Sequence, residues 1–412
     1  MPRSPRRVGA RFVAFLRADF AGVRAGFVAL LISSGGDLVT GVTFATISNT
    51  LYLLPGLVVL VPAAIGMRGN VFGALGSRLG TMIHTGTFRV SRRIDTEVGQ
   101  NLSGAILSSL ATAAMLAVLA KLMCEMLVRT PSISIADFMV VSVIGAILSS
   151  LVVLVLTVAV AAYCANRDLD LDNVAAPIVT AAGDMVTLPS LFLATYLLGF
   201  RFVTPTIAIL CAAIGVAAAV VGLRARALPI LRRIVIESLP ILALAGIVDL
   251  LAGITIQNRF SSFIKFPALL VMVPAFLEDA GSLGSILAAR VSTKLHLGTL
   301  GESGTSWGAA VDDVMLVYLY AIPVFVFLGL TSIAVANVLN KASPGFVDML
   351  GVSLIAGFLA TTGAVIVGFY SAVATHRFGF DPDNHAIPLV TSSLDLLGAL
   401  SLILAIVILG LA

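Results

Sequence analysis

The sequence is short of charge. Only 11% of its 412 residues are Asp, Glu, Lys or Arg, whereas a soluble domain carries about 25%. Hydrophobic residues make up 59%, and the mean hydropathy is +1.09. This composition excludes an ordinary soluble domain and predicts an integral membrane protein. The apolar runs are long enough for helices of about 20 residues and do not alternate as barrel strands do, so we expect an all-α protein.

Cysteine is scarce as well, and the common motifs of catalysis are missing. Cys124, Cys164 and Cys211 lie scattered in apolar runs, which gives neither a disulfide framework nor a thiolate metal site. The chain contains no phosphate-binding loop and no nucleophile elbow. The arginines near its N-terminus lack the interleaved aromatic residues of a nucleic-acid surface. We therefore expect no enzyme, no nucleic-acid partner and no ATP-driven transport within this chain.

What the chain does contain is a repeat. VPAAIGMRGNVFGALGSRLGT at 61–81 returns as VPAFLEDAGSLGSILAARVST at 273–293, without a gap and at an offset of 212. The stretch 169–184 returns at 380–395 with an offset of 211. A register kept over roughly 150 residues indicates a tandem duplication.

The apolar segments predict two five-helix units and one extra helix. We expect a basic leader at 1–24, a first unit at 25–200, a linker helix with a basic loop at 201–233, and a second unit at 234–412. Five spans end on the opposite side of the membrane, so the extra crossing at 202–223 lets the second unit repeat the orientation of the first. The units are therefore predicted to be parallel, with a pseudo-two-fold axis along the membrane normal and eleven spans.

Positive charge predicts the orientation of these spans. With a cytoplasmic N-terminus, the inner loops and leader hold about sixteen Lys and Arg residues against about six outside. We expect a multi-pass protein of the cell membrane with its C-terminus outside. Because the two repeats together form a pseudo-dimer, we expect the chain to function as a monomer in the bilayer.

Small residues follow one face of the second helix in both copies, at steps of three and four. Two interpretations remain open, a smooth face for close helix packing or a helix that lines a narrow polar pathway. The second interpretation, with the prolines of the fifth helices, predicts these pore-lining residues: Gly66, Gly69, Gly73, Ser77, Gly281, Ser282, Ser285, Pro177 and Pro388.

Charged residues interrupt the same helix. Each costs about 2.5–3.5 kcal/mol within a membrane span, so such side chains normally face a partner or water. Arg68 of the first copy aligns with Ala280, next to Glu278 and Asp279 of the second copy. We hypothesise that Arg68 pairs with these two acids across the pseudo-two-fold axis.

Each fifth helix carries Pro, Thr and Asp at i, i+3 and i+7, which places a hydroxyl one turn from a carboxylate. The residues are Pro177, Thr180 and Asp184, and Pro388, Thr391 and Asp395. Asp184 falls about 15 Å into its apolar run, near the bilayer midplane. Parallel repeats would bring both carboxylates to a common axis, where like charges demand a cation. Oxygen ligands without His or Cys suit Mg²⁺ or Ca²⁺ better than Zn²⁺.

A further symmetric pair, Asp37 and Asp249, lies in the first span of each unit. These residues serve either as structural hydrogen-bonding groups or as an accessory cation site.

These motifs resemble the MgtE magnesium-transporter superfamily, most closely its duplicated branch with the eukaryotic solute-carrier relatives. The stretch 61–81 is similar to the second-helix signature of that branch. DLDNVAAPIVTAAGD and DPDNHAIPLVTSSLD are similar to its fifth-helix signature. The resemblance covers both units, nearly the whole chain. Bacterial members also carry a large cytoplasmic sensing region with CBS domains, which the leader is too short to supply, so we expect gating that is simpler or that comes from elsewhere.

The resemblance implies a pore between the two units, lined by second and fifth helices. It implies that the fifth-helix aspartates meet hydrated Mg²⁺, and it extends the site to the first-helix aspartates and to a second-helix asparagine. With the neighbouring hydroxyls and acids, the predicted metal-site residues are Asp184, Asp395, Asp37, Asp249, Asn70, Thr180, Thr391, Glu278 and Asp279.

The sequence therefore predicts passive, channel-like transport of Mg²⁺, or of Mn²⁺, Co²⁺ or Ca²⁺. One alternative is an exchanger that couples the divalent ion to Na⁺ or H⁺ through Asp37, Asp249 or the pair Glu278 and Asp279. Another is a membrane scaffold or metal sensor that transports nothing.

Overall fold

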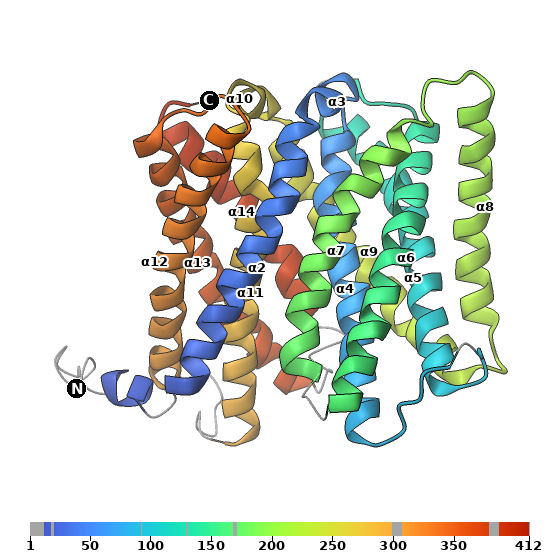
Figure 1. Ribbon diagram of the computed structural model, residues 1–412, viewed down its shortest axis with the longest axis horizontal. Helices are drawn as coiled ribbons and strands as arrows, with labels where there is room; N and C mark the ends of the chain where they lie inside the picture. Colours follow the sequence, from blue (N-terminus) through green and yellow to red (C-terminus); the bar gives the residue numbers. More distant parts are fainter. Residues whose placement is uncertain are drawn as a thin grey trace.

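The computed structural model describes residues 12–17, 20–91, 93–128, 131–167, 171–298, 307–378 and 387–411. Every regular element in these ranges is a helix, and the long helices form one bundle (Figure 1). The helices are α2 (Phe20–Thr46), α3 (Ser48–Leu53), α4 (Leu57–His84), α5 (Glu97–Leu127), α6 (Ile135–Arg167), α7 (Leu171–Thr195), α8 (Val203–Arg224), α9 (Pro229–Gln257), α10 (Phe260–Lys265), α11 (Ala268–His296), α12 (Trp307–Val338), α13 (Phe346–Phe378) and α14 (Ile387–Ile408).

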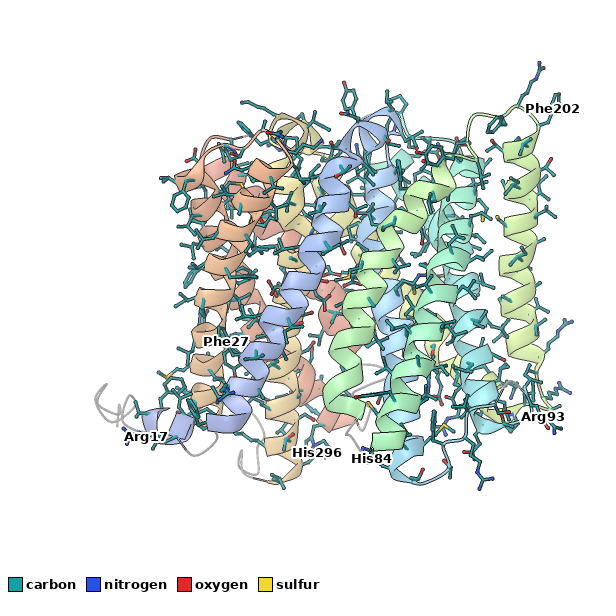
Figure 2. All side chains as sticks on the ribbon, in the orientation of Figure 1. Arg17, Phe27, His84, Arg93, Phe202 and His296 are labelled. Carbon is teal, nitrogen blue, oxygen red and sulfur yellow. The ribbon has the colours of Figure 1, made fainter. Side chains whose placement is uncertain are left out.

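Eleven of the described helices are long, in the order that the sequence predicts. Ten are long and apolar enough to cross a membrane, and the eleventh, α7, contributes the apolar stretch Val179–Thr195. The all-helical membrane fold with two repeats is thereby confirmed. We call the end of the bundle with His84 and His296 the histidine end, and the end with α3 and α10 the short-helix end (Figures 1 and 2).

A short helix and a turn precede the long helix α4. The chain leaves α3 at Leu53, turns through Pro55 and Gly56, and begins α4 at Leu57. Gly56 has a φ of 90°, which residues with a side chain rarely adopt, and its position sets the start of α4. The turn is tied to the α5–α6 loop, because the Ile133 amide donates to the Pro55 carbonyl at 3.0 Å.

The first helix of each unit packs against the second helix of the other unit, α2 on α11 and α9 on α4. Glycine allows this close approach. A Cβ on Gly41 would lie 1.8 Å from the carbonyl oxygen of Val271, and one on Gly253 would lie 2.3 Å from that of Val59. The two contacts are related by the sequence offset of 212. The units are thus interlocked around their first helices.

The repeat also extends to the third and fourth helices. Ser142 of α6 donates to the Ala113 carbonyl of α5 at 2.6 Å, and Ser353 of α13 donates to the Phe325 carbonyl of α12 at 2.6 Å. The linker helix α8 breaks the symmetry, since it stands at one edge of the bundle against α5 and α6 (Figure 1). The fold therefore places α4, α7, α11 and α14 at the junction of two equivalent units.

Candidate cation site

A cavity of about 460 Å³ with acidic and polar side chains in its wall lies between the two units. Its walls come from α4 and α7 of the first unit and from α11 and α14 of the second. The predicted residues that line it are Asp184, Asp395, Glu278, Asn70, Thr180, Thr391, Gly66, Gly69, Gly73, Ser77, Ser282, Ser285 and Pro388. Ile65, Ala74, Gly76 and Ile387 complete the wall. The small-residue face of α4 therefore borders open space, as the pathway interpretation of that face requires.

Three carboxylates lie at the inner end of this cavity. Asp184 on α7 and Asp395 on α14 come from equivalent positions of the two units, and Glu278 on α11 lies near both. Asp184 is 2% exposed, so protein and cavity surround its carboxylate. The symmetric spacing in the sequence thus brings both fifth-helix acids to one place.

The first-helix acids lie directly behind the fifth-helix acids and do not line the cavity. Asp37 interacts with Asp184, and Asp249 interacts with Asp395. Both first-helix carboxylates are fully buried. Gly66 allows this arrangement in the second pair, because a Cβ there would lie 2.9 Å from Asp249 Oδ2 and 3.6 Å from Asp395 Oδ2.

Oxygen and nitrogen atoms of uncharged side chains continue the polar wall towards the histidine end. Asn70, Ser77, Ser282 and Ser285 project from the second helices of the two units. Thr391 donates to the carbonyls of Ile387 and Pro388 within its own helix, each at 3.1 Å, which leaves its oxygen free to accept a further hydrogen bond. No group of three or more His, Cys, Asp or Glu side chains in the described ranges is arranged to hold a metal ion.

Besides the first-helix acids, two of the predicted site residues do not line the cavity. Asp279 points away from the cavity to α2, where Ser34 Oγ donates to its Oδ1 at 2.5 Å. Gly281 faces the backbone of Thr391 and does not border the cavity. The side chain of Pro177 lies outside the described part of the structure. Adjacent residues on a helix point about 100° apart, so Glu278 and Asp279 cannot share one face.

The hypothesis that Arg68 pairs with Glu278 and Asp279 is wrong. Arg68 Nη1 donates to Ser150 Oγ of α6 at 2.8 Å and also to Ser109 Oγ of α5. Neither of these helices lines the cavity. The sequence alignment placed Arg68 at the correct level of the helix but could not give the direction of its side chain.

An apolar closure, which the sequence did not predict, lies beyond the carboxylates. A separate pocket of about 30 Å³ lies there, lined by Asp184, Glu278 and Asp395 on one side and by apolar residues towards the short-helix end. The apolar residues are Phe44, Val61, Pro62, Ile65, Val273, Pro274 and Leu277. In the sequence, the Val-Pro pair that recurs one turn before Gly66 and Glu278 could have indicated this apolar closure.

Known proteins share both repeats. Residues 61–194 and 273–405 match the MgtE family, described as divalent cation transporters. The chain is 25% identical over 401 residues to solute carrier family 41 member 3 of Rattus norvegicus, covering 90% of this chain and 84% of that protein. It is 26% identical over 415 residues to solute carrier family 41 member 2 of Gallus gallus, covering 94% and 67%. No solved structure matches the chain.

Proposed function

Because the chain belongs to the MgtE family of divalent cation transporters, we propose that it carries Mg²⁺ through the cavity between its two repeats. In this proposal the ion moves passively down its electrochemical gradient, and Mn²⁺, Co²⁺ and Ca²⁺ are the competing ions. An inside-negative potential contributes about 4.6 kcal/mol per 100 mV to the uptake of a divalent ion, twice the figure for one charge. Uptake needs no further source of energy.

The observation that carries the proposal is the group of carboxylates at the inner end of a polar cavity. Asp184, Asp395 and Glu278 would repel one another there, and a divalent cation among them removes the repulsion. Mg²⁺ gives up its waters reluctantly and usually keeps several of them. Six waters take about 180 Å³ at their density in the liquid, and the cavity of about 460 Å³ can accommodate them.

The other polar residues would hold that hydration shell. Asn70, Thr180 and Thr391 offer amide and hydroxyl oxygens on the cavity wall. We assign Asp37 and Asp249 a supporting role, since each lies behind a fifth-helix acid and orients its carboxylate. The apolar closure beside Phe44 and Leu277 would block the ion from the short-helix end. With the predicted cytoplasmic histidine end, this conformation faces inward.

A second candidate is an exchanger, in which Na⁺ or H⁺ moves in the opposite direction. The surplus of acids favours it, because Asp37, Asp249 and Glu278 lie around two carboxylates that already balance one divalent ion. The two candidates differ in whether a gradient of the second ion is required.

Uptake of Mg²⁺ into liposomes that contain the purified protein tests the proposal. We expect the double variant Asp184→Asn, Asp395→Asn to lose uptake. The matched control is Asp279→Asn, a buried acid on a pathway helix that faces α2 instead of the cavity, and it should keep uptake. Uptake that survives the double variant would place the ion elsewhere. Uptake that occurs only with an opposing Na⁺ or pH gradient would establish the exchanger.

A further inference from the structure

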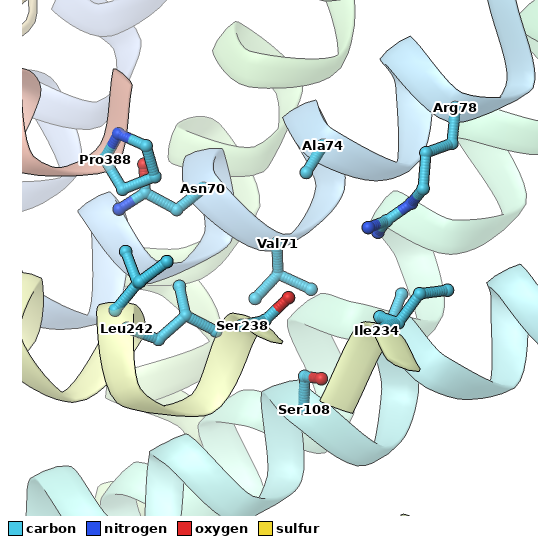
Figure 3. Close-up of a pocket in the computed structure, with 11 residues that line it drawn as sticks. Asn70, Val71, Ala74, Arg78, Ser108, Ile234, Ser238, Leu242 and Pro388 are labelled. Atoms are coloured by element: carbon cyan, nitrogen blue, oxygen red, sulfur yellow. The ribbon is translucent and has the colours of Figure 1, made fainter. Parts of the chain in front are cut away.

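A second, much smaller pocket lies behind the wall of the cation cavity. It has a volume of about 20 Å³ and lies between α4, α5 and α9 (Figure 3). About 10–15 Å³ by this measure holds one water, so the pocket has room for one small particle. Asn70, Ala74 and Pro388 border both this pocket and the cation cavity.

The polar atoms that face this pocket are mainly hydrogen-bond donors. Arg78 Nε, Ser108 Oγ and Asn70 Nδ2 are buried and have no hydrogen-bond partner among the described residues. Ser238 adds another hydroxyl to the wall (Figure 3). An arginine side chain has five N–H groups and no acceptor, so its partner must accept hydrogen bonds.

The charges around Arg78 do not cancel. Glu237 on α9 lies near enough to interact with Arg78, but it already pairs with Arg233 at 2.7 Å. Glu237 therefore interacts with two arginines. Arg78 is half-buried, its Nε is fully buried, and among the described residues Glu237 is the carboxylate that interacts with it. Charged groups that leave water are normally paired.

The second repeat has that negative charge within the chain. Arg290, the counterpart of Arg78, donates from Nε to Asp313 Oδ1 of α12 at 2.9 Å, and Lys294 pairs with the same carboxylate. At the offset of 212, the counterpart of Asp313 is Asn101. The first repeat thus has the arginine but not the acid.

The second repeat also fills the space that corresponds to the pocket. The counterpart of Ser108 is Tyr320, whose hydroxyl donates to the Val23 carbonyl at 2.7 Å. The same hydroxyl would lie 3.3 Å from a Cβ on Gly26, the counterpart of Ser238. An aromatic ring packed against glycine in one repeat is replaced in the other by two serines and a void.

We propose that the pocket binds a single halide ion, chloride under physiological conditions, held by Arg78, Ser108 and Ser238. The anion supplies in the first repeat the charge that Asp313 supplies in the second. Water would accept the same hydrogen bonds but would add no negative charge beside Arg78. Because Asn70 lies in the shared wall, the halide stabilises the first-repeat side of the cation cavity.

Thermal unfolding of the full-length protein in detergent tests this binding. Chloride or bromide replaces gluconate at constant ionic strength, and we expect a saturable rise in the unfolding temperature of about 2–4 °C. A crystal structure in bromide should show an anomalous peak beside Arg78. An empty or water-filled pocket in bromide would overturn the proposal.

Three variants test which residues hold the halide. One alters Arg78, one alters its counterpart Arg290, and one gives the pocket the residues of the second repeat. Arg78→Gln should abolish the halide-dependent rise, whereas Arg290→Gln should lower the unfolding temperature equally in halide and gluconate. The double variant Ser108→Tyr, Ser238→Gly copies Tyr320 and Gly26, and it should remain folded but insensitive to halide. If Arg78→Gln fails to fold, this double variant and the bromide peak decide the question. A halide-dependent rise that persists in the double variant would overturn the proposal.

Discussion

Replacement of Gly73 by leucine separates the two interpretations of the small-residue face of α4. A Cβ on Gly73 meets no atom within 4 Å, and the residue borders the cavity. The leucine side chain would therefore project into open space without a clash. Leucine is also better than glycine within a helix by up to about 1 kcal/mol. We expect the folded protein to be as stable as the wild type, or slightly more stable.

Transport should nevertheless fall. The leucine narrows a cavity of about 460 Å³ through which a Mg²⁺ ion with most of its waters must pass. Removal of even part of that hydration shell is costly. We expect at least a tenfold loss of Mg²⁺ uptake into liposomes, which corresponds to a barrier higher by about 1.4 kcal/mol. Uptake is compared at equal protein content, and the unfolding temperature is measured on the same preparation.

The control is Gly41→Ala, a smaller substitution at a glycine that packs closely against the backbone of α11. Its Cβ would lie 1.8 Å from the Val271 carbonyl oxygen, so two backbones must separate. Such overpacking costs about 1–3 kcal/mol or more, and the unfolding temperature should fall. If Gly73→Leu unfolds as readily as Gly41→Ala, the face of α4 is a packing surface. If Gly73→Leu folds and transports at the wild-type rate, the cavity is not on the ion pathway.

Two more predictions concern the interlocked helices and the apolar closure. Gly253→Ala should lower the free energy of unfolding by about 1–3 kcal/mol in denaturant titrations, because its Cβ would lie 2.3 Å from the Val59 carbonyl oxygen; an unchanged midpoint would contradict the close contact. The double variant Phe44→Ala, Leu277→Ala removes two large side chains of the closure and should raise passive Mg²⁺ leak into liposomes; a leak equal to that of the wild type would place the barrier elsewhere.

The sequence was most informative where its two copies agree. Asp184 and Asp395 occupy the same position of equivalent helices, so symmetry alone predicted that they would meet. The spacing of Gly66, Gly69 and Gly73 by three and four predicted a common face, and that face borders the cavity. In both cases the spacing of residues along the chain determines which face of the helix they occupy, because the geometry of an α-helix is regular.

Features that depend on the neighbouring helix could not be predicted in the same way. Arg68 lies at the level of Glu278 along the repeat, yet its hydrogen bonds go to serines of α5 and α6. Asp279 pairs with Ser34 because α2 belongs beside α11 of the other unit. The sequence repeat is equally compatible with first helices packed on their own unit. The structure was needed to show that each first helix packs on the other unit, as the contacts of Gly41 and Gly253 demonstrate.

Fusion of the two units allows the halves of the site to differ. Glu278 and Gly66 are counterparts at the offset of 212. Glu278 lies near Asp37 and Asp184 of the first unit and also near Asp395 of the second. Gly66 lies against Asp249 and Asp395 and adds no carboxylate of its own. A dimer of identical chains would carry either both glutamates or neither. In a single chain each copy changes independently, so the cavity can carry one glutamate at a position where its counterpart is glycine.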